Sequence, residues 1–239
     1  MIYESKFTIN FRDVDKDNKI KPSSIMQYMQ EAGGLQSDEL GEGVNYKHIT
    51  NTVWILIGWK MKIFNNNISW NEECFVKTWS RKIEKLYSYR EYEFRDEEDN
   101  LVAIATSKWV FLDINANTFK TPPEDLIQKY DSEDKSLFEE EIEKLKEPKD
   151  LEKNFTYIVQ KRDIDTNNHM NNTIYLNVAE NVLPENANIN EVEILYKKEC
   201  KLSETVNVFS YEVSTNEIIV VIKNNDDTKT HTILKIKYE

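Results

Sequence analysis

One histidine, His169, lies in a short block rich in carboxamide and carboxylate side chains, Asp165-Thr166-Asn167-Asn168-His169-Met170-Asn171-Asn172. An imidazole exchanges a proton near neutral pH, so it can take a proton from water or give one to a leaving group. We expect the block to be a loop that leads into a helix at Asn171 and Asn172, where free backbone N–H groups could stabilise an oxyanion. The alternative is that the Asx residues only cap the helix and His169 is a polar surface residue.

The same block occurs earlier in the chain without its histidine. Arg12-Asp13-Val14-Asp15-Lys16-Asp17-Asn18-Lys19-Ile20 aligns with Arg162-Asp163-Ile164-Asp165-Thr166-Asn167-Asn168-His169-Met170, which lies 150 residues later. Arg, two Asp and one Asn are identical, whereas Lys19 stands where the second copy has His169. Such an internal repeat indicates a duplicated module. One copy keeps a proton-transfer group, and the other has lost it.

A partner for His169 is expected in the segment Tyr196-Lys197-Lys198-Glu199-Cys200-Lys201. The Glu199 carboxylate could raise the basicity of the imidazole and orient a water molecule. Cys200 offers the rival scheme, a thiolate nucleophile that His169 activates. Adjacent residues of a strand point to opposite faces, so we expect only one of the two to face His169, and the alternation does not decide which. In the first half, a loose alignment places Lys62 where Glu199 stands.

Apolar residues at three-to-four spacing predict one helix after each block, over 25–35 with Ser as its N-cap and over 174–182. Stretches rich in β-branched and aromatic residues predict strands in the first half over Val53–Phe64, Glu73–Ile83, Tyr87–Arg95 and Leu101–Ile114. In the second half they predict Glu191–Cys200, Thr205–Val213, Glu217–Lys223 and Thr230–Tyr238. One helix followed by several strands, made twice, is an α+β architecture.

The charged segment between the halves predicts a linker or a surface helix. We therefore expect an N-terminal domain over 1–130, a linker over 131–150 and a C-terminal domain over 151–239. All five tryptophans lie in the first half, together with Met26 and Met29. They form either a large aromatic core or an apolar cavity for a flexible hydrocarbon chain, with Met26, Met29 and Trp54 as candidate lining residues.

Composition excludes several classes of partner. The net charge of −12 and the pI near 4.9 disfavour nucleic acid and anionic membranes. The chain begins without the apolar run of a signal peptide and has no stretch of membrane-spanning length, so a cytoplasmic protein is expected. Cys74 and Cys200 form neither a disulfide framework nor a metal-ligand pattern. We expect no metal and no cofactor.

The motif Asp165-x-Asn167-x-His169-x-Asn171-Asn172, followed about thirty residues later by Tyr196-x-x-Glu199-Cys200, resembles the acyl-ACP thioesterases. This family consists of two tandem hotdog domains, each a long helix wrapped by a twisted antiparallel sheet. Four segments of the first half are similar to its N-terminal hotdog: Arg12-Asp13-x-Asp15, Met29-Gln30-Glu31-Ala32, Thr78-Trp79 and Ser107-x-Trp109-Val110. The resemblance covers nearly the whole chain. Met170 replaces the valine that usually follows the histidine.

The resemblance implies that the protein hydrolyses the thioester of fatty acyl-acyl carrier protein, which releases the fatty acid and ends elongation. It assigns catalysis to Asp165, Asn167, His169 and Glu199, and it makes Cys200 dispensable. The N-terminal hotdog would hold the acyl tail, and the C-terminal hotdog would perform hydrolysis. We therefore expect Glu199 and His169 to position and deprotonate a water. Asn167 would orient that water or the imidazole, and Asp165 would hold the loop and tune His169.

The partner implied is an acyl carrier protein that bears its acyl chain on phosphopantetheine. Such a carrier is acidic, so an acidic enzyme would meet it through a local basic patch, for which the candidates are Arg162, Lys197, Lys198 and Lys201. Alternatively, these are solvated lysines that protect a strand edge. An acyl-CoA thioesterase, a hotdog hydratase or dehydratase, and a non-catalytic acyl-thioester binding module are the rival functions. The sequence decides neither the acyl chain-length preference nor whether two chains form a homodimer.

Overall fold

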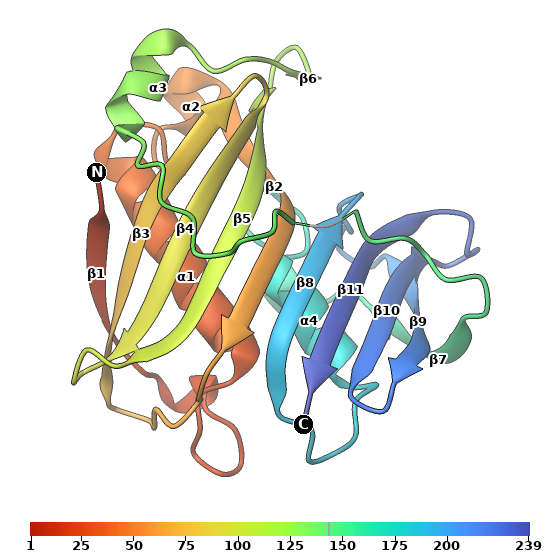
Figure 1. Ribbon diagram of the computed structural model, residues 1–239. Coiled ribbons are helices and arrows are strands. Elements are labelled where there is room, and N and C mark those ends of the chain that lie inside the picture. Colours follow the sequence, from red (N-terminus) through yellow and green to blue (C-terminus); the bar gives the residue numbers. More distant parts are fainter. Residues whose placement is uncertain (143) are drawn as a thin grey trace. The chain divides into compact units, whose positions relative to one another are not determined.

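The computed structural model describes residues 1–142 and 144–239. Two compact units divide the chain: the first holds Met1–Ile57 and Met61–Ile142, and the second holds Gly58–Lys60 and the chain beyond Ile142. In Figure 1 each unit has a helix lying against an antiparallel sheet, and the helices are α1 and α4.

The first unit is an antiparallel sheet in the order β1-β3-β4-β5-β2, with β6 paired to β5. Its strands are β1 (Tyr3–Thr8), β2 (Thr52–Ile63), β3 (Glu73–Glu84), β4 (Tyr87–Asp96), β5 (Leu101–Asp113) and β6 (Thr118–Phe119). Its helices are the 3-10 turn η1 (Phe11–Asp13), α1 (Pro22–Glu39), α2 (Lys47–Thr50) and α3 (Glu124–Tyr130). The four long strands expected from the sequence are confirmed to within a residue or two.

Helix α1 packs its apolar face on this sheet. Pro22 is its first residue and Lys21 its N-cap, so the expectation of a serine N-cap was wrong. A proline at this position has the right φ and lacks only an N–H that would have no acceptor in the helix. The helix continues through Gly33, where a Cβ would lie only 3.2 Å from the Tyr92 hydroxyl and 3.3 Å from Arg90 Cδ. The absence of a side chain at Gly33 therefore lets α1 lie close to β4.

The second unit repeats this plan with a shorter helix. Its strand order is β8-β11-β10-β9-β7. Its elements are β7 (Glu152–Ile158), the 3-10 turn η2 (Lys161–Asp163), α4 (Asn172–Glu180), β8 (Ile189–Tyr196), β9 (Thr205–Ser214), β10 (Glu217–Asn224) and β11 (Thr230–Tyr238). One face of α4 is buried through Tyr175, Leu176, Val178 and Ala179. Each unit thus has the helix-on-sheet arrangement of a hotdog domain.

One strand boundary differs from the expectation in a way that affects the site. Strand β8 ends at Tyr196 rather than at Cys200. Glu199 and Cys200 lie instead in the irregular segment between β8 and β9. The rule that neighbouring side chains alternate across a strand therefore does not apply to them. The sequence also did not predict β1 and β7, which pair at the outer end of each sheet.

The segment between the halves is not a helix. Residues 131–142 and 144–151 contain neither helix nor strand. Within the first unit, the segment crosses β3 and β4 and makes specific hydrogen bonds there. Trp79 Nε1 donates to the Lys135 carbonyl at 2.9 Å, and the Leu137 amide donates to Glu91 Oε2 at 3.2 Å. Residues up to Glu141, whose carboxylate pairs with Arg81 at 2.7 Å, therefore cover the outer face of the first sheet.

Residues that are identical in the two copies of the repeated block fix the backbone by hydrogen bonds. Asp13 and Asp163 are both buried, and each accepts a tyrosine hydroxyl at 2.6 Å, from Tyr28 and Tyr157 respectively. Each also accepts the backbone N–H three residues earlier, which closes the 3-10 turn. The same carboxylate therefore fixes the chain at the same point in both units.

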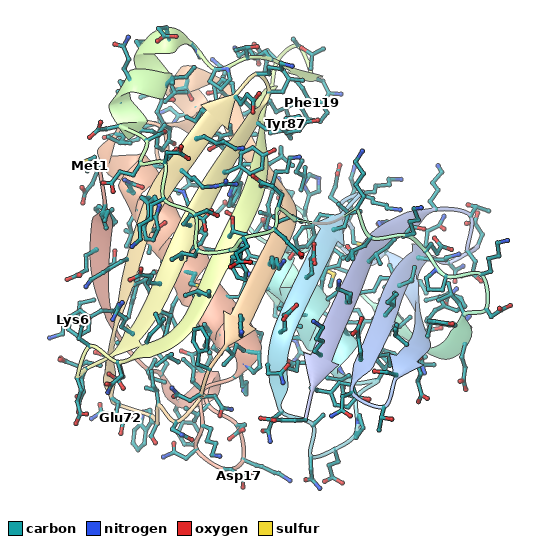
Figure 2. All side chains as sticks on the ribbon, in the orientation of Figure 1. Met1, Lys6, Asp17, Glu72, Tyr87 and Phe119 are labelled. Atoms are coloured by element: carbon teal, nitrogen blue, oxygen red, sulfur yellow. The ribbon has the colours of Figure 1, made fainter. Side chains whose placement is uncertain are left out.

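Replacing Asp13 with alanine is expected to lower the free energy of unfolding by about 2–3 kcal/mol, because hydrogen bonds to a buried carboxylate are lost. Urea denaturation measures the effect. The control is Asp17→Ala, because Asp17 is an exposed residue of the same loop (Figure 2). We expect this change to alter the free energy of unfolding by no more than about 0.5 kcal/mol. Equal effects of the two changes would show that Asp13 has no special structural role.

Candidate active site

The loop that carries His169 is shaped by Asp165. The Asp165 carboxylate Oδ1 accepts the amide of Asn167 at 2.8 Å and that of His169 at 3.3 Å. The Asp165 amide donates in turn to the His169 carbonyl at 2.9 Å. Asn168 adopts a left-handed conformation with φ of 61°, which asparagine tolerates better than most residues. Asp165 thus positions His169 through the backbone.

The first copy of the block has the same loop. Asp15 Oδ1 accepts the amides of Asp17 and Lys19, both at 2.9 Å, and Asn18 has φ of 58°. The two aspartates and the left-handed asparagine are therefore requirements of the loop itself. Only the side chain at the end of the loop differs, lysine in one copy and histidine in the other. This explains why the identical residues survive in a copy that lacks the histidine.

The structure brings His169 and Glu199 together. His169 Nε2 lies 3.8 Å from Glu199 Oε1, and the two side chains are 32% and 54% exposed. The Met170 amide donates to the Cys200 carbonyl at 2.8 Å, so the backbones next to both residues are joined. A separation of 3.8 Å is longer than a direct hydrogen bond, and a water molecule can contact both groups at once.

Cys200 lies in the interior of the second unit. It is fully buried, and its amide donates to the Tyr175 hydroxyl at 3.0 Å. Burial raises the pKa of the Cys200 thiol to about 12. A thiol with this pKa remains protonated at neutral pH, so it is a poor nucleophile. Of the two candidates from the sequence, Glu199 is the residue next to His169.

Cys200→Ser is accordingly expected to leave most of the hydrolytic rate, within about fivefold. A thiolate mechanism predicts near-complete loss, because a serine hydroxyl is a much weaker nucleophile without a dedicated base. Turnover of a purified acyl thioester gives the comparison, with the melting temperature as a check on folding. A matching measurement is alkylation of Cys200 by iodoacetamide in a Cys74→Ala background, which should stay slow at pH 8 because burial raises the pKa of this thiol.

Most backbone amides at the start of α4 already donate a hydrogen bond within the protein. Asn171 is the N-cap, and its side-chain oxygen accepts the Thr173 amide at 3.0 Å. The Asn171 amide itself donates to the Asp163 carbonyl at 2.7 Å. Asn172 is the first residue of the helix, and an amide at that position has no acceptor within the helix. The expectation of an oxyanion site at Asn171 and Asn172 therefore narrows to the Asn172 amide.

The position equivalent to Glu199 in the first unit is Asn67, not Lys62. The Ile20 amide donates to the Ile68 carbonyl at 2.9 Å, just as Met170 donates to Cys200 in the second unit. Ile68 is thus the counterpart of Cys200, and Asn67, which precedes it, is the counterpart of Glu199. Lys62 lies within β2, before the equivalent loop begins. The alignment failed because it placed Glu199 on a strand.

The remaining candidates lie in different places. Met26 and Met29 are fully buried on α1. Trp54 lies on β2 in a cluster with Phe111, Leu126 and Tyr130, and its ring centroid is 4.8 Å from that of Phe111. The four basic candidates for carrier contact are all exposed: Arg162, Lys197, Lys198 and Lys201.

The sequence did not indicate the hydroxyl contacts of two tyrosines that support the site, although Tyr196 belongs to the motif. Tyr175 holds the Cys200 amide, and the Tyr196 hydroxyl donates to the Asn172 carbonyl at 2.9 Å. Their rings meet edge to face at 5.6 Å. Both residues fitted the apolar pattern of their helix and strand, and nothing in that pattern marked the hydroxyl groups.

Among the described residues, no helix is long and apolar enough to cross a membrane.

Both halves of the chain are similar to domains of known proteins. Residues 1–130 match the acyl-ACP thioesterase N-terminal domain, and residues 146–239 match the acyl-ACP thioesterase C-terminal domain. The chain is 23% identical over 237 residues to oleoyl-acyl carrier protein thioesterase 1 of Arabidopsis thaliana, covering 90% of this chain and 65% of that protein. It is 22% identical over 228 residues to the Coriandrum sativum oleoyl-acyl carrier protein thioesterase, covering 85% and 61%. The chain thus spans less than two thirds of the length of these two relatives.

Two solved structures have the same fold along the entire chain. An acyl-ACP thioesterase from Bacteroides thetaiotaomicron matches with a TM-score of 0.82 and 20% identity, covering 100% of this chain and 98% of that one. The 12:0-ACP thioesterase from Umbellularia californica matches with a TM-score of 0.84 and 16% identity, covering 100% and 97%. The α+β fold of two tandem hotdog domains is confirmed. With both of its domains matched, the chain belongs to the acyl-ACP thioesterase family.

Proposed function

We propose that this protein hydrolyses the thioester of fatty acyl-acyl carrier protein and releases the free fatty acid. One observation carries the proposal: His169 Nε2 and Glu199 Oε1 lie 3.8 Å apart at a half-exposed position in the second unit. The equivalent residues of the first unit, Lys19 and Asn67, offer neither an imidazole nor a carboxylate. An ester-cleaving site needs a base for water, and only the second unit has that pair among the residues described.

In the proposed mechanism a water molecule lies between Glu199 and His169, which together remove its proton as it attacks the thioester carbonyl. Asn167 helps to orient the water, and Asp165 keeps the loop in place. The Asn172 amide stabilises the oxyanion, a contribution on the order of a hundredfold for one donor. The proton then passes from His169 to the departing thiolate. Collapse of the intermediate forms the carboxylic acid and the free thiol of the phosphopantetheine.

Substrate binding divides between the halves in this proposal. The N-terminal domain, residues 1–130, holds the acyl chain near Met26, Met29 and Trp54, and the C-terminal domain, residues 151–239, performs the chemistry. Exposed Arg162, Lys197, Lys198 and Lys201 surround the block and the Glu199 segment. They give an acidic carrier a basic contact on a chain of net charge −12. The relatives are named for oleoyl and 12:0 substrates, and the assay therefore covers several chain lengths.

Incubation of the purified protein with acyl carrier proteins of several chain lengths tests the proposal. Free fatty acid as the product supports it, and a parallel series of acyl-CoA thioesters shows which carrier is used. A hydroxylated or unsaturated product would instead identify a hydratase or dehydratase. Thioester that is bound but unchanged would identify a binding module. Either of these two outcomes contradicts the proposal.

A further inference from the structure

Three side chains of metal-ligating type converge in the second unit. Cys200 Sγ, a carboxylate oxygen of Glu204 and a ring nitrogen of His231 all lie within 4.8 Å of one another. Cys200 and His231 are fully buried, and the Glu204 side chain is 29% exposed. The proposed hydrolysis uses none of the three. The sequence hid this set, because 26 residues separate Glu204 from His231 and only the pairing of β11 with β8 brings them together.

The orientation of His231 leaves a nitrogen facing this cluster. Its Nδ1 lies 3.1 Å from the Lys198 carbonyl, which can only accept a hydrogen bond, so Nδ1 carries the proton. In the neutral ring the lone pair is then on Nε2. That buried atom lies 3.1 Å from Glu204 Oε1 yet forms no hydrogen bond with any described residue. A lone pair that faces a carboxylate oxygen is repulsive unless a proton or a metal ion is shared between them.

The arrangement around Nδ1 is typical of histidine ligands in metal sites. Such histidines commonly donate the second ring N–H to a backbone carbonyl, which fixes the tautomer and directs the other nitrogen at the metal. Here the Lys198 carbonyl plays that part. The His231 carbonyl is also held, because it accepts the amides of Lys197 and Lys198 at 2.8 and 3.1 Å. The imidazole is therefore fixed before any ion binds.

The first unit supplies an internal comparison. Ile68 is the counterpart of Cys200, as the matching backbone hydrogen bonds show. Val102 is the counterpart of His231, because it accepts the Phe64 amide where His231 accepts that of Lys197. The first unit thus buries two aliphatic side chains where the second buries sulfur and nitrogen.

The glutamate is common to both units. Glu72, labelled in Figure 2, accepts the Ser69 amide at 2.8 Å, and Glu204 accepts the Lys201 amide at 3.0 Å. Both bonds use Oε2, so each glutamate closes the turn before the following strand. Oε1 of Glu204 is left to face His231. Cysteine and histidine are therefore additions of the second unit to a turn that does not need them.

We propose that Cys200, Glu204 and His231 bind one thiophilic divalent cation of the Zn²⁺ class. Thiolate sulfur, imidazole nitrogen and carboxylate oxygen are the ligands that this ion prefers. Bond lengths of about 2.0–2.3 Å place tetrahedral ligand atoms about 3.5 Å apart, so small rotations of the side chains would suffice. The thiol gives up its proton to solvent as the metal–sulfur bond forms, and the fourth position remains for water.

Cobalt titration of the purified full-length protein tests the site, because Co²⁺ reports thiolate coordination by its near-ultraviolet charge-transfer band. We expect saturation at one Co²⁺ per chain, displacement of cobalt by Zn²⁺, and a rise in melting temperature with Zn²⁺. Cys200→Ile and His231→Val, which introduce the residues of the first unit, should each weaken binding by more than about 100-fold. Circular dichroism checks that both variants fold, and His231→Gln provides a second, polar replacement.

Cys74→Ala is the matched control, since it removes the other buried thiol and should leave the cobalt spectrum unchanged. Absence of stoichiometric binding at millimolar Co²⁺ or Zn²⁺ would overturn the proposal. So would a spectrum without a thiolate band, or binding that persists in both Cys200→Ile and His231→Val. None of these readouts depends on thioester hydrolysis, so failure of the metal site and failure of the proposed function are distinguishable.

Discussion

Replacing His169 with alanine is expected to lower kcat for acyl-ACP hydrolysis by about 10²–10⁴, because the site loses the group that accepts and returns the proton. The loop should keep its shape. Asp165 holds it through backbone amides, and the first unit adopts the same loop with Lys19 at this position. A steady-state assay of fatty acid release measures the rate, and the melting temperature should stay within a few degrees.

The first unit provides the matched control. Lys19→Ala removes the side chain at the same point of an identical loop, and we expect its kcat to stay within about twofold of the unchanged protein. A large loss of kcat in Lys19→Ala together with a small loss in His169→Ala would place the chemistry in the first unit. In that case the assignment of roles to the two units would have to be reversed.

Glu199→Gln is expected to be comparably severe, with a loss of about 10²–10⁴ in kcat. The amide keeps the shape and the hydrogen-bonding reach of the carboxylate but cannot accept a proton from water. The side chain is 54% exposed, so the fold should tolerate the change. Single-turnover measurements separate a slower chemical step from weaker binding.

Asn67→Ala, at the equivalent position of the first unit, serves as the control for Glu199. It should leave both the rate and the stability near those of the unchanged protein. If Glu199→Gln retained full activity while Cys200→Ser abolished it, the water mechanism would be wrong. A covalent acyl-enzyme on Cys200 would then be the better account.

Periodicity in the sequence was sufficient for most of the fold. The strands from Val53 to Ile114 and from Thr205 to Tyr238 alternate clearly or are strongly apolar, and the structure has them nearly where they were expected. The helices after each block follow from their apolar faces. The strands β1 and β7 were missed because their patterns are short and mostly exposed, and pairing with β3 and β9 stabilises them.

Glu199 was harder to predict from the sequence than His169. His169 stood out, because its twin differs at that one position of a shared loop. Glu199 depended on where β8 ends, and local propensity continued the strand to Cys200. In the structure, the Lys197 and Lys198 amides both donate to the His231 carbonyl, which turns the chain away from the sheet. These two hydrogen bonds join residues more than thirty positions apart, so no local pattern could reveal them.

The repeat also shows why identity between the two copies was not a guide to catalysis. Asp13 and Asp163 close a turn, and Asp15 and Asp165 shape a loop, in the first unit and the second alike. The proposed mechanism uses the positions that differ. Lys19 against His169 was visible from the sequence, whereas Asn67 against Glu199 became visible only from the backbone hydrogen bonds.

An exchange between the twins is the most direct test of this division. His169→Lys combined with Glu199→Asn writes the residues of the first unit into the second, and Lys19→Ala combined with Asn67→Ala alters the first unit instead. Measured as kcat/KM for acyl-ACP, the first double variant should lose at least about 10²-fold, no less than either single change, and the second should stay within about twofold. Retained hydrolysis in the first, or a comparable loss in the second, would contradict the assignment of catalysis to the C-terminal unit.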